Sequence, residues 1–120
     1  MNNYDKICEE ILKVDSKMRY AGIYHKGTFY SKMPNGLKSL LNEAEIKNSA
    51  LNAVKRWETR LSLASRLGNP IYSLTKYEKV NRITFPVGED GLILVSTEPS
   101  LDSKLIIDKI LDIKKKYLSE

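Results

Sequence analysis

The chain has 120 residues, a formal net charge of +5 and 42% hydrophobic residues. This length predicts a single domain spanning residues 1–120, and the hydrophobic content is that of a folded protein rather than a disordered tail. No apolar run approaches the ~18–20 residues that span a bilayer, and acidic residues inside the first apolar pattern exclude a secretory signal. We therefore expect a cytoplasmic protein with no membrane partner.

Few residues in the chain are suited to catalysis. One cysteine, Cys8, excludes a disulfide framework and a cysteine-based zinc site, and one histidine, His25, excludes a His-rich metal site. No carboxylate pair or nucleophile–base set emerges from the spacing. The sequence therefore predicts a protein that is not an enzyme, with no catalytic residues, no metal and no cofactor. Cys8 is expected to be a buried thiol and His25 an exposed turn residue.

The first third of the chain predicts a helix followed by a hairpin. Apolar residues recur at helical spacing over residues 4–14. Two β-prone runs, at residues 19–25 and 28–30, flank a short turn that contains glycine. Gly22 lies inside the first of these runs, which indicates a bulge or the close approach of another element.

A long helix is predicted from about residue 37 or 42 to residue 67. Gly68 is a suitable C-terminal cap, and Pro70 prevents continuation of the helix. The helix is also where the positive charge is most concentrated, with six Lys and Arg against three acidic residues over residues 37–67. Its apolar stripe is predicted to consist of Ala50, Val54, Trp57, Leu61 and Ala64.

Three strands and a last helix are expected in the remaining sequence. The strands are predicted at residues 71–77, 80–85 and 92–96, and the continuously apolar third run indicates a central strand covered on both faces. The last helix is predicted to begin after Ser100 or Asp102. Its buried stripe is predicted to comprise Leu105, Ile106, Ile110, Ile113 and Tyr117. The fold class is therefore α+β in the order α-β-β-α-β-β-β-α, with one five-stranded antiparallel sheet, a long central helix and terminal helices.

Two stretches of sequence, together with this element order, resemble the roadblock family, whose fold is related to the profilin-like and longin folds. They are Arg19-Tyr20-Ala21-Gly22-Ile23-Tyr24-His25-Lys26-Gly27, and Phe85-Pro86-Val87 with Leu92-Ile93-Leu94-Val95. The sequence also looks similar to small uncharacterised archaeal proteins of roadblock-like plan, through R-Y-x-G-I near its start and the segments 78–80 and 95–99. The resemblance implies a cytoplasmic, partner-binding protein. Roadblock domains commonly dimerise through the central helix and an edge strand, and many act as platforms for small GTPases.

The predicted binding site lies on the central helix and consists of Val54, Arg56, Trp57, Arg60 and Leu61. Arg56 and Arg60 are four residues apart and share one helical face. Tryptophan and arginine are enriched at interface hot spots, so the cluster fits a dimer or partner interface. The same groups also fit stacking on single-stranded nucleic acid, and the plain alternative is a core tryptophan beside a solvated basic face. Lys79 and Arg82 are predicted to form a secondary basic contact to an acidic partner, and a solvated sheet face explains them equally well.

Three functions therefore remain open from the sequence. The preferred one is a non-enzymatic interaction module that forms a homodimer and serves as a platform or regulator for a small GTPase or signalling complex. The second is a nucleic-acid-binding protein that uses the basic central helix, for which affinity should fall steeply with salt. The third is a small-ligand sensor with a pocket between sheet and helix, because six aromatic residues lie in or next to the predicted strands.

Overall fold

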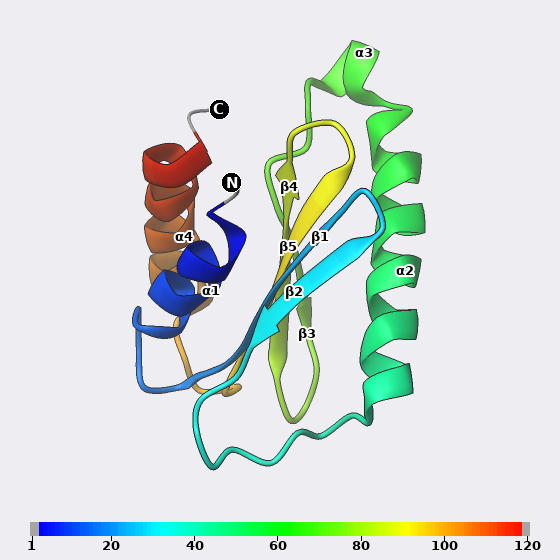
Figure 1. Cartoon of the computed structure of the whole chain (residues 1–120). Helices are drawn as coiled ribbons and strands as arrows, with labels where there is room; N and C mark the ends of the chain where they lie inside the picture. Colours follow the sequence, from blue (N-terminus) through cyan, green and yellow to red (C-terminus); the bar gives the residue numbers. More distant parts are fainter. Residues whose placement is uncertain (1–2, 119–120) are drawn as a thin grey trace.

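The computed structural model describes residues 3–118, in which four helices and five strands follow one another along the chain. They are α1 (Tyr4–Leu12), β1 (Met18–His25), β2 (Thr28–Lys32), α2 (Glu43–Leu61), α3 (Ala64–Leu67), β3 (Ser73–Lys76), β4 (Asn81–Val87), β5 (Gly91–Thr97) and α4 (Ser103–Leu118). The strands form one antiparallel sheet in the order β2-β1-β5-β4-β3. The predicted α+β class and five-stranded sheet are confirmed (Figure 1).

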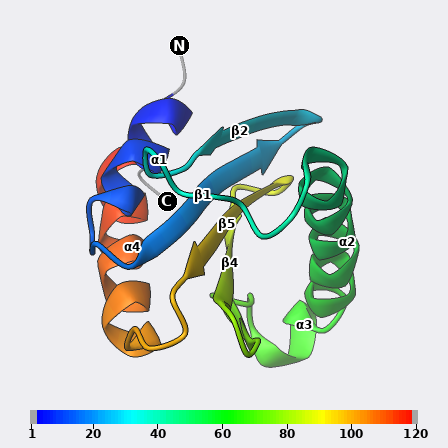
Figure 2. The ribbon, with the colours of Figure 1, turned by 90° about the horizontal axis from the view of Figure 1, so that it is seen from below.

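The sheet is the middle of three layers, with α1 and α4 on one face and α2 on the other (Figures 1 and 2). The hairpin joins the three-stranded meander where β1 pairs with β5, with Ile23 opposite Ile93. Successive side chains of β5 point to opposite faces. Ile93 and Val95 lie in the core beneath α1 and α4, whereas Leu92 and Leu94 lie beneath α2. The prediction that residues 92–96 form a central strand covered on both faces is confirmed.

The larger core lies between the sheet and the two terminal helices. The predicted α1 stripe is confirmed there, and the alternating residues of β4 point into the same core. The buried members of these two sets are Tyr4, Ile7, Cys8, Ile11, Ile83, Phe85 and Val87. Across residues 3–118, no helix combines the length and the apolar character that crossing a bilayer requires.

The buried stripe of α4 differs from the prediction at one position. Ile106 and Ile110 are buried as expected, but Leu105 is 51% exposed and Ile107 is buried in its place. Each residue advances about 100° around a helix. Ile106 and Ile110 lie one turn apart and define the buried side of α4. Leu105 therefore points away from this side, whereas Ile107 lies at its border.

The C-terminal end of the central helix also differs from the prediction. Asn42 begins the helix as expected: its side chain accepts a hydrogen bond from the Glu45 amide at 2.8 Å, and the Glu45 carboxylate accepts one from the Asn42 amide at 2.9 Å. However, α2 ends at Leu61 rather than at residue 67. The Ser62 hydroxyl donates to the Thr59 carbonyl at 2.6 Å, a local bond that competes with the helical pattern. Gly68 then ends the short helix α3 at a φ of +84°.

The sequence predicts the burial of Cys8 and the exposure of His25, and the structure agrees with the first prediction only. Cys8 is buried, as predicted. His25 is not an exposed turn residue but half-buried at the end of β1. The Tyr4 hydroxyl lies 3.1 Å from His25 Nδ1, and the two rings meet edge to face. The reason is that α1 begins over the hairpin, so its first residue covers the imidazole.

Burial of the Cys8 thiol makes the stability of the fold depend on pH. Burial, with a smaller contribution from Asp5, raises the pKa of Cys8 from 9.0 to about 12. A raised pKa in the folded state means that this state binds the proton more tightly than the unfolded chain. The stability contributed by the neutral thiol is therefore complete below pH 9 and is lost as the pH rises toward 12. Urea denaturation is expected to show a steeper loss of stability above pH 9 in the wild type than in Cys8→Ala. Identical pH profiles for the two proteins would contradict this.

Candidate functional site

A second, smaller core attaches α2 to the sheet. Ala50, Ala53 and Trp57 are the residues of α2 that are buried, and they pack on Leu92 and Leu94 of β5. The Trp57 side chain is 4% exposed, and its indole Nε1 has no hydrogen-bond partner among the described residues. Trp57 is therefore the one large side chain among the three buried residues of α2, and the half-buried Val54 packs beside it.

The five predicted site residues lie on two sides of this attachment. Trp57 faces the sheet, whereas Val54 and Arg60 are half-buried and Arg56 and Leu61 are exposed. The Arg60 guanidinium lies 5.4 Å from the centre of the Trp57 ring, which fits a cation–π contact. The surface available to a partner is thus formed by the residues that flank Trp57, and Trp57 fixes their position.

The structure brings the two predicted basic contacts close to the central helix. Arg56 lines a small hollow between α2 and the strands β3 and β4, together with Arg82. Arg82 and Lys79 also line a larger cavity at the other end of α2. The sequence does not predict that Arg56 and Arg82 line the same hollow, because they belong to different elements that meet only in the folded chain.

A run of exposed apolar side chains follows the end of α2 to the edge of the sheet. We call it the apolar edge; it consists of Leu61, Leu63, Leu67, Ile71, Tyr72 and Leu74, whose exposed fractions range from 40% to 77%. The run ends in β3, which pairs with β4 on one side and is the last strand of the sheet on the other. β3 covers four residues rather than the predicted 71–77. An apolar run next to an open strand edge is a typical site for association.

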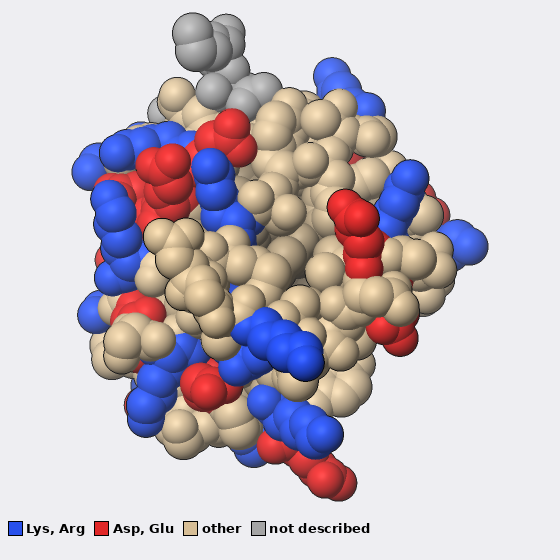
Figure 3. Space-filling view, turned by 60° about the horizontal axis from the view of Figure 1, so that its bottom comes forward, with Lys and Arg blue, Asp and Glu red and all other residues tan. Residues whose placement is uncertain are grey.

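The larger cavity has a volume of about 510 Å³ and opens between the start of α2, the loop 33–42 and the β3–β4 turn. Its apolar lining comprises Tyr20, Met33, Leu40, Leu41, Ile46, Tyr77 and Val80. Its charged lining comprises Arg19, Glu78, Lys79 and Arg82. Figure 3 brings this end of the molecule forward and shows a hollow of uncharged surface with Lys and Arg side chains beside it. A pocket between sheet and helix belongs to the third function left open by the sequence, which does not indicate its position.

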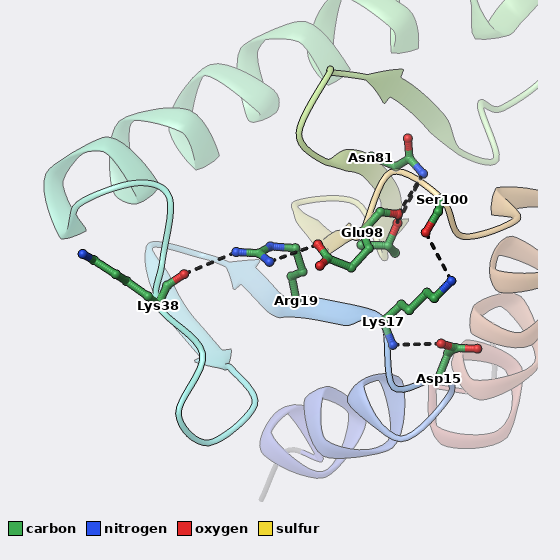
Figure 4. Close-up of polar contacts among 8 residues, drawn as sticks. Asp15, Lys17, Arg19, Lys38, Asn81, Glu98 and Ser100 are labelled. Atoms are coloured by element: carbon green, nitrogen blue, oxygen red, sulfur yellow. Dashed lines mark hydrogen bonds and ion pairs between the residues drawn. The ribbon is translucent and has the colours of Figure 1, made fainter.

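A polar network fixes one wall of this cavity (Figure 4). Arg19 donates to Glu98 Oε2 at 3.0 Å and to the Lys38 carbonyl at 3.3 Å. The side-chain amide of Asn81 in turn donates to the Glu98 carbonyl at 3.4 Å. Arg19 thereby connects the start of β1 to the loop 33–42 and to the segment after β5. Sequence analysis did not single out this role, because Arg19 and Glu98 are 79 positions apart.

The Tyr20 ring forms the floor of the cavity and explains Gly22. A Cβ added at Gly22 would lie 2.6 Å from the Tyr20 hydroxyl oxygen. The close approach is therefore made by a neighbour in the same strand, and the irregularity of β1 lies between Met18 and Tyr20 instead of at Gly22. Burial raises the pKa of Tyr20 to about 12, with the Ser31 side chain opposing the rise. The Tyr20 hydroxyl thus keeps its proton to a higher pH than a solvent-exposed tyrosine.

The surfaces described above combine apolar side chains with charge. Within residues 3–118, no group of three or more His, Cys, Asp and Glu side chains is placed to hold a metal ion. The cavity combines an apolar lining with an excess of cations, and the apolar edge combines hydrophobic side chains with an open strand. Both features fit recognition through burial and charge.

No protein-family model and no curated protein matches the sequence. Solved structures do match. The crystal structure of a roadblock/LC7 domain from Streptomyces avermitilis superposes with a TM-score of 0.72 and 11% identity, over 97% of this chain and 98% of that one. MglB from Myxococcus xanthus superposes with a TM-score of 0.69 and 17% identity, over 95% of this chain and 93% of that one. The chain has the roadblock fold.

The predicted roadblock resemblance is therefore confirmed at the level of the fold, while the likeness to archaeal proteins remains a prediction. A structure described as MglB with a tetrameric arrangement also shares the roadblock fold, with a TM-score of 0.59 and 17% identity over 94% of this chain and 88% of that one. A shared fold does not by itself establish a shared function. The surfaces of this chain that bear on its function are the apolar edge, the flank of α2 and the cavity.

Proposed function

We propose that this protein is a non-enzymatic interaction module that forms a homodimer through its apolar edge and presents the flank of α2 to a protein partner, a small GTPase. The observation that carries the proposal is the apolar edge itself, which leads from the end of α2 into an unpaired edge strand. Large exposed apolar patches on a soluble domain mark interaction sites.

The geometry of β3 supports pairing between two copies of the chain. Leu74 lies opposite Ile83, a residue of the larger core, so both side chains are on the same face of the sheet. The Tyr72 ring lies 6.4 Å from the Phe85 ring. Both exposed side chains therefore extend the larger core to its open border. Two copies related by a two-fold axis would bring the same patch together and continue the sheet through β3.

The flank of α2 supports an acidic protein partner. Arg56 is exposed, and Arg60 is held beside Trp57 by the ring contact. A guanidinium group binds a carboxylate through two parallel hydrogen bonds, and arginine is enriched at binding hot spots. Many roadblock domains, which the sequence resembles, act as platforms for small GTPases. We expect the effect on such a partner to be conformational.

The nucleic-acid alternative receives less support from the distribution of charge. On the face in Figure 3, Lys and Arg alternate with Asp and Glu rather than form a continuous basic stripe. A nucleic-acid-binding surface typically gathers its cations along one track.

The test combines oligomeric state with partner capture. Analytical ultracentrifugation of the wild-type chain over a range of concentrations is expected to show a dimer that dissociates on dilution. Affinity capture of the tagged protein from its native cytosol, with and without nuclease, is expected to recover a nuclease-resistant small GTPase. A monomer at every concentration would overturn the dimer. Protein partners that disappear with nuclease, accompanied by nucleic acid, would overturn the proposed partner.

A further inference from the structure

We propose that the cavity of about 510 Å³ at the start of α2 binds a small molecule with an apolar body and a single anionic headgroup. This inference goes beyond the proposed function, because the cavity is lined by none of the residues of the apolar edge. It gives the chain a ligand site in addition to its interaction surface.

The size and lining of the cavity fit the apolar body. Small-molecule sites commonly have volumes of about 300–1,000 Å³ and are mostly apolar, with a few polar groups that fix orientation. Here the Tyr20 ring, Ile46 and Val80 line the cavity, and the exposed side chains of Leu40 and Leu41 also contribute to it. An apolar ligand would remove these leucines from water, which is favourable in proportion to the area buried.

The wall formed by the loop 33–42 is already ordered. Arg19 binds the Lys38 carbonyl, and the Ser39 hydroxyl donates to the Leu41 carbonyl at 2.6 Å. The reciprocal hydrogen bonds of Asn42 and Glu45 then fix the point where the loop enters α2. Because the wall exists before a ligand arrives, binding does not have to supply the entropy cost of ordering it.

The charges at the cavity select an anion. Arg19, Lys79 and Arg82 line it against one carboxylate, that of Glu78. Arg19 is neutralised by Glu98, whereas Lys79 and Arg82 make no ion pair with any carboxylate in residues 3–118. These two cations can donate charge-assisted hydrogen bonds, which are stronger than those between neutral groups. A cationic headgroup would meet an excess of like charge.

The test compares three amphiphiles that share a ten-carbon chain. Decanoate, decanol and decyltrimethylammonium are titrated calorimetrically into the 120-residue chain, below the micelle concentrations of the two ionic amphiphiles and below the solubility limit of decanol. Decanoate is expected to bind with one molecule per chain, about tenfold more tightly than decanol, and the cation is expected not to bind. Arg82→Gln and Lys79→Gln are each expected to weaken decanoate binding by about threefold, and the double variant by about tenfold, to the affinity of decanol. Lys104→Gln, which removes an exposed cation on α4, is the matched control and should leave the affinity unchanged.

The results distinguish an anion-binding cavity from a non-specific hydrophobic surface and from the proposed dimer interface. Equal binding of all three amphiphiles would indicate only a hydrophobic surface and would overturn the anion site. No binding of decanoate, or an equal effect of Lys104→Gln, would overturn it as well. Leu74→Glu, which changes the apolar edge, is expected to retain full decanoate affinity, so the two proposals can fail independently. Thermal unfolding of each variant without ligand confirms that the fold is intact, since these side chains are exposed or half-buried.

Discussion

Replacement of Trp57 by alanine is expected to lower the free energy of unfolding by about 3 to 5 kcal/mol, the range for removing a large buried aromatic side chain. The indole is 4% exposed and packs on Leu92 and Leu94. Its two buried companions on α2, Ala50 and Ala53, are too small to replace its contacts. Urea denaturation followed by circular dichroism measures the loss, because Trp57 is the only tryptophan and its substitution removes the fluorescence signal.

Two further variants test the reason for this loss. Trp57→Phe keeps a large ring, and it breaks no hydrogen bond because the indole Nε1 has no partner within residues 3–118. We expect Trp57→Phe to lower the free energy of unfolding by less than half as much as Trp57→Ala does. Arg56→Ala, an exposed neighbour on the same helix, should change stability by less than about 0.5 kcal/mol. If Trp57→Ala instead unfolded like the wild type and lost only self-association, Trp57 would be an interface anchor that faces a partner.

The strands show what a sequence pattern can determine. Ile83, Phe85 and Val87 alternate with less buried residues along β4. This alternation is a local property of an extended chain and can be read from the sequence before the sheet is known. The continuous apolar run of β5 likewise required two covering layers, and both are present. These two patterns, with the long helix between the hairpin and the meander, were sufficient for the architecture.

The end of α2 shows what the pattern left open. Residues 62–67 contain no proline or glycine, so helix propensity alone favoured continuation to Gly68. The hydroxyl of Ser62 instead bonds to the Thr59 carbonyl, and the chain turns before α3 begins. That turn sends Leu63 and Leu67 to the surface and creates much of the apolar edge. The exposed apolar side chains of residues 63 and 67 therefore depend on a turn that helix propensity does not indicate.

The candidate site was only partly accessible to sequence reasoning, for a related reason. A helical stripe shows which residues share a face, but not whether a sheet or a partner covers that face. Trp57 illustrates this, since the stripe was consistent with both a core position and an interface. The cavity was less accessible still, because its wall depends on a contact between Arg19 and Glu98 that only the folded topology creates.

Substitution of Leu74 by glutamate is expected to abolish dimer formation over the concentration range in which the wild type is dimeric. Leu74 is 44% exposed in the single chain, so the carboxylate remains hydrated in the monomer. In the proposed dimer it would be buried at the β3 edge. A hot-spot substitution costs about 2 kcal/mol or more. A two-fold interface contains the residue twice, so the loss is about 4 kcal/mol, or roughly a thousandfold in the dissociation constant.

Leu105→Glu is the matched control for this prediction, because Leu105 is 51% exposed and lies on α4, on the opposite side of the larger core from the sheet. Both variants introduce the same carboxylate at a similarly exposed leucine, so a general effect of charge on association would appear in both. We expect sedimentation to show a monomer for Leu74→Glu and an unchanged dimer for Leu105→Glu, with the same circular dichroism spectrum for both variants. A dimer for Leu74→Glu with a monomer for Leu105→Glu would place the interface on α4. A dimer in both variants would exclude β3 from the interface, because a carboxylate buried without a partner at a paired strand edge would weaken association.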